Sequence, residues 1–137
     1  MDVINHKNKT GKLTKLKGAK DISNEELLEL KTDVLVPAAL EDQITKKNAD
    51  KIKAKLVLEM ANRPITPEAD EIFLGKHIFV VPDILANAGG VVVSYFEWVQ
   101  NSTNYYWSEK EVLEKLKTYM ANAAKGLSKV CTDFKCD

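Results

Sequence analysis

Short apolar runs that alternate with capped helical segments restrict the fold of this 137-residue chain more than any other feature. The runs at residues 34–36, 55–60 and 78–81 have the length and the bounding residues of buried strands. Helical segments of about ten residues separate them, which is typical of βα units on a parallel sheet. The sequence therefore predicts an α/β fold with a mostly parallel sheet.

Helix start signals mark the segments before and between these runs. Ser23 and Glu26 form a capping box, which predicts a helix that continues to Leu30. Thr45 is the expected cap of a second helix over residues 46–53. Both helices would connect or flank strands of the sheet.

Two further helices are predicted in the second half of the chain. Thr66 and Pro67 indicate the start of a helix that ends near Gly75. Ser108 and Glu111 repeat the capping box before a long C-terminal helix. Its apolar stripe recurs every three or four residues, as an amphipathic helix requires; the stripe consists of Val112, Leu116, Met120, Ala123, Leu127 and Val130.

Composition excludes several classes of protein. The chain has 20 basic and 20 acidic residues, whereas a dedicated nucleic-acid binder usually carries a basic surface. No run of about 18 apolar residues indicates a membrane span. Cys131 and Cys136 could form a disulfide in the tail, but a reduced, cytoplasmic protein is the preferred interpretation, and neither they nor His6 and His77 form a metal site.

Ligands of parallel α/β sheets bind beyond the carboxyl ends of the strands. Three segments occupy that position, namely residues 37–39, 60–64 and 82–87, and all are rich in alanine, asparagine or proline. Small side chains let a flat ligand approach the backbone, and asparagine amides can bind ribose hydroxyls or a carboxamide. Ordinary loop chemistry explains each segment alone, but three along one sheet edge favour a ligand site.

Residues 88–100 pose a choice between strand and helix. Val91, Val92 and Val93 favour a strand, but the residues after them lack clean alternation. In a helix starting near Gly89, the unpaired first amides would suit a carboxylate. Val91, Ser94, Tyr95 and Trp98 would then share one face, so we predict a helix, with its aromatic residues used for packing.

The chain lacks a G-x-G-x-x-G fingerprint, a Walker-type loop, a nucleophile elbow and a metal-ligand cluster. These residues alone name no reaction. Longer stretches of the sequence are more informative. They closely resemble the cofactor-binding domain of the glutamate dehydrogenase family, and they read "PAALEDQIT", "KLVLEMAN" and "VVPDILANAGGVVVSYFEWVQN". The resemblance extends from about Lys9 to Val130.

The resemblance implies a partial Rossmann-like, three-layer αβα domain that binds NAD or NADP. Family members catalyse oxidative deamination of L-glutamate to 2-oxoglutarate and ammonia, are usually hexameric, and carry the catalytic lysine and aspartate in another domain. No residue of this chain matches those two. The chain resembles the later part of the cofactor domain as one unit, with a basic lead-in (1–20), βα units (21–104), a C-terminal helix (105–130) and a tail (131–137).

Individual positions match the family's site residues. Ser94 matches the serine that binds the side-chain carboxylate of glutamate, and Val91 matches a valine of the substrate pocket. Asn87 matches an asparagine at the mouth of the cleft near nicotinamide and substrate. The implied cofactor-binding residues are Ala38, Ala39, Asn62 and Asn87.

Arg63 and Ile65 depart from the family text, which has a glycine and a threonine there. Arg63 could crowd the cofactor loop or add a charge near the cofactor's phosphates. A second hypothesis of a different class is a non-catalytic nucleotide-binding or interaction module derived from such an enzyme. In either case, an exposed apolar strand edge would favour self-association.

Overall fold

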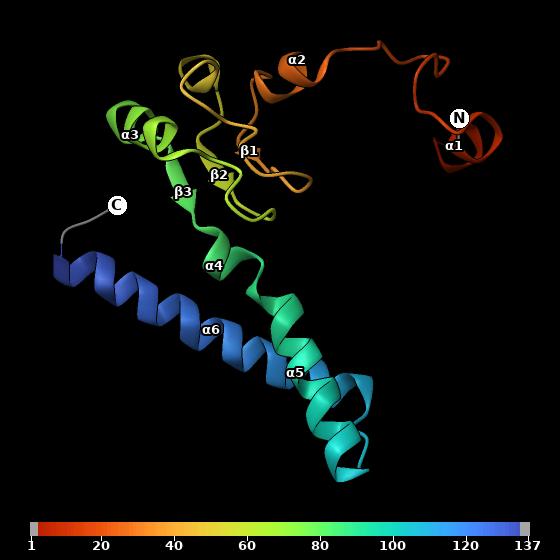
Figure 1. Ribbon diagram of the computed structural model, residues 1–137, viewed down its shortest axis with the longest axis vertical. Helices are drawn as coiled ribbons and strands as arrows, with labels where there is room; N and C mark the ends of the chain where they lie inside the picture. Colours follow the sequence, from red (N-terminus) through yellow and green to blue (C-terminus); the bar gives the residue numbers. More distant parts are fainter. Residues whose placement is uncertain (1–2, 135–137) are drawn as a thin grey trace.

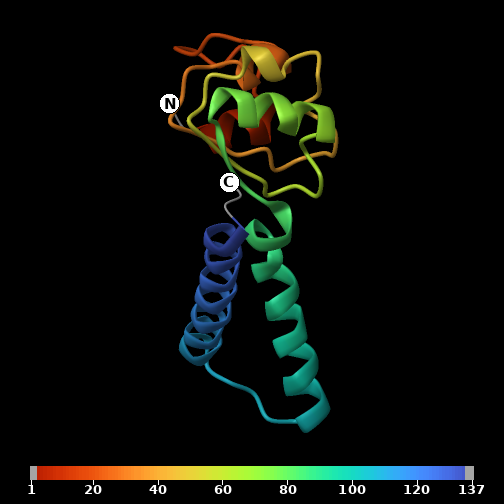
Figure 2. The same ribbon diagram turned by 90° about the vertical axis from the view of Figure 1, so that its left-hand side faces the viewer.

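The computed structural model describes residues 3–134. Its elements form a small α/β unit and an antiparallel pair of long helices beside it (Figures 1 and 2), while α1 stands apart from both. The elements in chain order are α1 (Val3–Thr10), α2 (Asn24–Leu28), β1 (Val34–Leu35), the 3₁₀ turn η1 (Ala49–Lys51), β2 (Leu56–Leu58), α3 (Pro67–Lys76), β3 (Phe79–Val81), α4 (Asp83–Ala86), α5 (Ala88–Thr103) and α6 (Glu109–Phe134).

The sheet has three parallel strands in the order β1-β2-β3. Leu35 pairs with Val57, and Val57 pairs with Val80, so these three side chains lie on the same face. The α/β class, the parallel sheet and the long C-terminal helix predicted from the sequence are thus confirmed. The strands are shorter than the apolar runs that predicted them.

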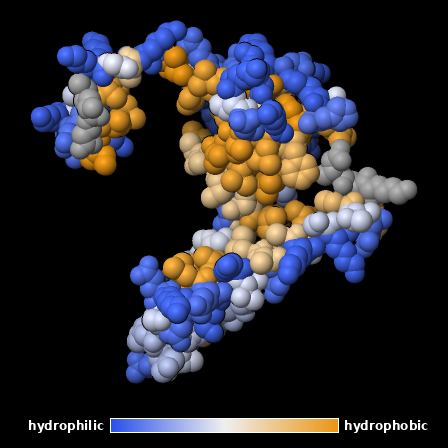
Figure 3. All heavy atoms as spheres, turned by 180° about the vertical axis from the view of Figure 1, so that it is seen from behind, coloured by the Kyte–Doolittle hydropathy of each residue, from blue (hydrophilic) through white to orange (hydrophobic). Residues whose placement is uncertain are grey.

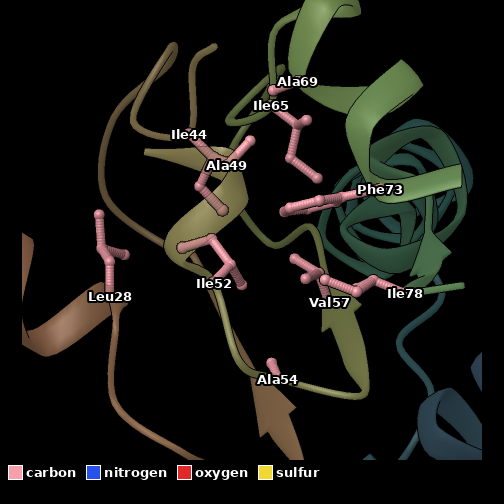
Figure 4. Close-up of a cluster of buried hydrophobic side chains, with 10 residues drawn as sticks. All are labelled: Leu28, Ile44, Ala49, Ile52, Ala54, Val57, Ile65, Ala69, Phe73 and Ile78. Carbon is pink, nitrogen blue, oxygen red and sulfur yellow. The ribbon is translucent and has the colours of Figure 1, made fainter. Parts of the chain in front are cut away.

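The core lies on the face that carries Val57, which is completely buried. Phe73 of α3 points into this core toward Val57 and Ile65 (Figure 4). The buried cluster consists of Leu28, Ile44, Ala49, Ile52, Ala54, Val57, Ile65, Ala69, Phe73 and Ile78. Two helices, α2 and α3, the 3₁₀ turn and the intervening loops therefore cover this face.

The opposite face of the sheet remains open. Val34, Leu56 and Phe79 are neighbours in register across it, and Phe79 is 54% exposed. Apolar side chains gather over the sheet on the side seen in Figure 3. We call Val34, Leu56, Leu58, Phe79 and Val81 the open sheet face.

The predicted helix over residues 46–53 is wrong. Only Ala49–Lys51 is helical there, and it is a 3₁₀ turn. Asn48 explains the difference, because its side chain accepts a hydrogen bond from the amide of Thr45 (2.8 Å) and donates one to the carbonyl of Gln43 (2.9 Å). Such local bonds to the main chain compete with a helix.

Other boundaries also shift. The capping box at Ser23 is present, but α2 ends at Leu28 rather than Leu30. The C-terminal helix runs over Glu109–Phe134 instead of 105–130, because the chain turns helical only after the cap at Ser108. The basic lead-in contains α1, a helix with no buried residue. Cys136 lies outside the described residues.

Residues 88–100 are helical, as the missing alternation predicted, and belong to α5. Phe96 anchors α5 on α6, with its ring edge-to-face against Trp107 (5.7 Å) and Tyr119 (5.5 Å). Packing is thus the role of Phe96, whereas Tyr95 and Trp98 stack on each other at 5.9 Å and remain exposed. Within residues 3–134, no helix is both long and apolar enough to cross a bilayer.

Candidate functional site

Three loops meet at the carboxyl edge of the sheet. The carbonyl of Pro37, after β1, accepts hydrogen bonds from the amides of Met60 (3.1 Å) and Ala61 (2.9 Å), after β2. The side-chain amide of Asn87, after α4, donates to the side-chain oxygen of Asn62 (2.8 Å). Residues from all three predicted ligand segments therefore lie at one edge, and two of the four predicted cofactor residues touch.

Ala38 and Ala39 are exposed at this edge, directly after Pro37. Their methyl groups leave the backbone of the loop accessible. Asn62 is also exposed and Asn87 is half-buried, so a ligand could reach the amide pair from solvent. The geometry suits a flat, hydrogen-bonding group more than a compact ion.

Val91 and Ser94 lie on the first turns of α5, beyond the amide pair. Ser94 is about 10 Å farther along the helix axis than Asn87, since a helix rises about 1.5 Å per residue. Its hydroxyl donates to the carbonyl of Gly90 (3.2 Å) and is exposed. Val91 is 70% exposed. With Tyr95 and Trp98, they form a mixed polar and apolar strip that faces solvent.

The start of α5 is less open to an anion than the sequence indicated. Helix α4 directly precedes it, and Asn87 joins the two without a side-chain cap. The amide of Asn87 donates to the carbonyl of Asp83 (3.0 Å), and the amide of Gly90 donates to the carbonyl of Asn87 (3.3 Å). These bonds use part of the donor set that a free helix terminus would offer.

A cavity of about 370 Å³ is lined by residues of the loop after β2, of α3, of β3 and of the start of α4. Its charged lining residues are Glu59, Arg63, Asp70 and Asp83. Neither Glu59 nor Asp83 was among the individual site residues predicted from the sequence. A charged residue at the end of the apolar run 55–60 is the signal that could have identified Glu59.

Glu59 is 8% exposed, and it holds a polar contact at the end of β2. Its Oε2 accepts a hydrogen bond from the amide of Asp83 (2.9 Å). Burial raises the pKa of the Glu59 carboxyl above its usual value; the backbone amide of Asp83 opposes this, and the charges of Asp83 and Asp70 add to it. The pKa of Glu59 is higher in the folded chain than in the unfolded chain. The contribution of Glu59 to stability is therefore complete below the unfolded-state pKa and is lost as pH rises through the folded-state pKa.

Arg63 contacts two aspartates. Its guanidinium pairs with Asp42 (3.2 Å), while its amide donates to Asp83 Oδ2 (2.8 Å). Its backbone has φ of +44°, in the left-handed region that favours glycine. This geometry explains why glycine suits the position. Among the described residues, no group of three acidic, histidine or cysteine side chains could hold a metal ion.

Comparison with known proteins identifies the family. The model of the family described as Glutamate/Leucine/Phenylalanine/Valine dehydrogenase matches residues 1–137. The chain belongs to this dehydrogenase family. Family membership accounts for the parallel sheet and for the run of matching text along its carboxyl edge.

Among relatives in the dehydrogenase family, an NAD-specific glutamate dehydrogenase of Clostridioides difficile is 50% identical over 132 residues, which cover 96% of this chain and 31% of the relative. An NADP-specific glutamate dehydrogenase of Synechocystis is 59% identical over 104 residues, 76% of this chain and 24% of the relative. The chain thus spans about a third or less of these relatives' length.

A solved dehydrogenase has the same fold. The hetero-hexameric glutamate dehydrogenase of Thermus thermophilus, in a leucine-bound form, superposes with a TM-score of 0.89 at 36% identity. The match covers 98% of this chain and 32% of that one. The Rossmann-type relationship inferred from the motifs is therefore confirmed.

Proposed function

We propose that this chain is part of an NAD- or NADP-dependent glutamate dehydrogenase. The parent reaction is oxidative deamination of L-glutamate to 2-oxoglutarate and ammonia, with hydride transfer to nicotinamide. The contact between Asn62 and Asn87 at the carboxyl edge carries the proposal, because it joins two loops where a flat cofactor would bind.

In this proposal, Ala38, Ala39, Asn62 and Asn87 form one wall of the cofactor groove. The exposed alanines allow close approach, and the amides bind the ribose or carboxamide of the nicotinamide half. Ser94 binds the substrate's side-chain carboxylate, after its hydroxyl turns from Gly90, and Val91 covers the substrate's methylene groups. When bound, the cofactor supplies the hydride acceptor.

The chain supplies no acid–base residue to this reaction, so the isolated chain is inactive. We treat residues 1–137 as one unit within a homo-oligomeric, cytoplasmic enzyme. The relatives include NAD-specific and NADP-specific proteins, so both cofactors belong to the proposal.

The test is calorimetry and an activity assay on the 137-residue chain. We expect micromolar binding of NAD and ADP, and no reduction of NAD or NADP in the presence of glutamate. Asn87→Ala should weaken NAD binding up to about tenfold, the size of one lost hydrogen bond. Asn8→Ala, on exposed α1, is the matched control and should bind as the parent does.

Saturable reduction of either cofactor would overturn the inactive-part proposal. Absence of NAD binding would overturn the cofactor wall in the isolated chain. The alternative, a non-catalytic nucleotide-binding or interaction module, predicts the same binding. The coding DNA immediately upstream separates the two, since an in-frame lysine-bearing domain supports the enzyme and a dedicated start with its own regulatory signals supports the module.

A further inference from the structure

Glu59 lies at the centre of a hydrogen-bond network next to the carboxyl edge of the sheet. Its amide donates to the carbonyl of Val81 (3.1 Å), which ties the end of β2 to the end of β3. Its carboxylate accepts the amide of Asp83, the first residue of α4. A nearly buried carboxylate is costly unless its hydrogen bond persists.

Asp83 extends the network in both directions. Its Oδ2 accepts the amide of Arg63, immediately after Asn62 (2.8 Å), and its carbonyl accepts the amide of Asn87 (3.0 Å). Asp83, which Glu59 holds, is thus bonded to the residue that follows Asn62 and to Asn87 itself. The contact between Asn87 and Asn62 closes the ring.

We propose that Glu59 is a positioning residue that holds Asn62 and Asn87 in contact through Asp83, and that proton uptake by Glu59 loosens this contact. The part that concerns the cofactor rests on the proposed function. A carboxylate makes stronger bonds to amides than a neutral carboxyl does, so protonation weakens the anchor of α4.

Burial of Glu59 is the main effect that favours proton uptake, and the nearby acidic charges add to it. Asp83 faces it from α4 and Asp70 from α3, and both charges disfavour its ionised form. Arg63, from the loop after β2, is the cation that lines the same cavity, but its guanidinium pairs with Asp42. Desolvation acts in the same direction, and the amides of Asp83 and Ile65 oppose it.

The test is a pH titration of the 137-residue chain by NMR, following the side-chain amide of Asn87 and the backbone amide of Asp83. We expect both signals to shift with one shared midpoint, above the usual glutamate value of about 4.3. Glu59→Gln should abolish the shared transition. Glu71→Gln, an exposed glutamate on α3, is the matched control and should leave the midpoint unchanged.

Asp70→Asn keeps Glu59 and removes one repelling charge from an exposed position, so it provides a test that does not disturb the anchor. We expect the shared midpoint to fall. An Asn87 signal that does not move with pH, or that still titrates in Glu59→Gln, would overturn the positioning role.

Binding of NAD, measured by calorimetry on either side of the midpoint, tests the functional consequence. We expect the parent chain to bind NAD severalfold more weakly below the midpoint, and Glu59→Gln to lose this pH dependence. Absence of NAD binding at any pH would overturn the cofactor wall in the isolated chain, while the NMR titration still decides the role of Glu59. If the NMR signals titrate but the affinity for NAD does not change with pH, protonation of Glu59 does not control cofactor binding.

Discussion

At the scale of single residues, Arg63 combines an unfavourable backbone conformation with a weak compensating contact. A left-handed φ costs a non-glycine residue about 1 kcal/mol. The ion pair with Asp42 is exposed and contributes less than about 1 kcal/mol. We expect Arg63→Gly to be about 1 kcal/mol more stable than Arg63→Ala, because both variants lose the ion pair and only glycine removes the strain. Urea denaturation of both chains measures the difference, and equal midpoints would contradict the explanation.

Prediction of single residues from the sequence succeeded for residues that follow neighbouring strands and so meet at the carboxyl edge of the sheet. It failed for residues whose role depends on their burial in the folded chain. Asn62 and Asn87 follow different strands, and the rule that parallel strands present their carboxyl ends at one edge was enough to bring them together. Glu59 was missed because its place at the end of the apolar run 55–60 was the only signal, and its low exposure of 8% depends on the folded loops around it. The conformation of Arg63 is likewise a property of the folded loop.

At the scale of elements, the capping box of α6 provides the clearest test. Ser108 accepts the amide of Glu111 (3.4 Å), and Glu111 accepts the amide of Ser108 (2.8 Å). Ser108→Ala should therefore lower stability by about 1 kcal/mol, measured by urea denaturation with circular dichroism. Ser128→Ala, inside the same helix, is the control and should have a small effect. If the two variants have equal stability, the cap contributes nothing.

The same cap depends on pH. The backbone and side chain of Ser108 hold the pKa of the Glu111 carboxyl below its usual value. The contribution of Glu111 to the stability of the folded chain is thus present above the unfolded-state pKa and is lost as pH falls through the folded-state pKa.

Elements with a specific start signal and a periodic stripe were predicted well, as α6 illustrates. Residues 46–53 were not, because a single threonine before polar residues does not exclude the turn that Asn48 stabilises. Strand lengths were overestimated because the apolar runs continue past the strand ends, and burial does not mark these ends, since Glu59 is buried whereas Val36 and Met60 are exposed. Local patterns therefore specify which element forms more reliably than where it ends.

At the scale of the whole molecule, the α/β unit buries one face of its sheet and leaves the other open. Val57 is fully buried, whereas Phe79, on the open sheet face, is 54% exposed. β1 is also an edge strand, whose outer backbone groups can pair with another chain. An apolar face that continues to such an edge favours association of two copies of this chain.

We expect the average mass of the 137-residue chain to rise with concentration in sedimentation experiments. Phe79→Lys should move this rise to about tenfold higher concentration, because burial of one phenylalanine side chain contributes about 1.5–3 kcal/mol. Leu113→Lys, an exposed apolar residue on α6, is the matched control and should associate as the parent does. A chain that remains monomeric at every concentration would contradict the self-association, and equal effects of both variants would move the interface away from the open sheet face.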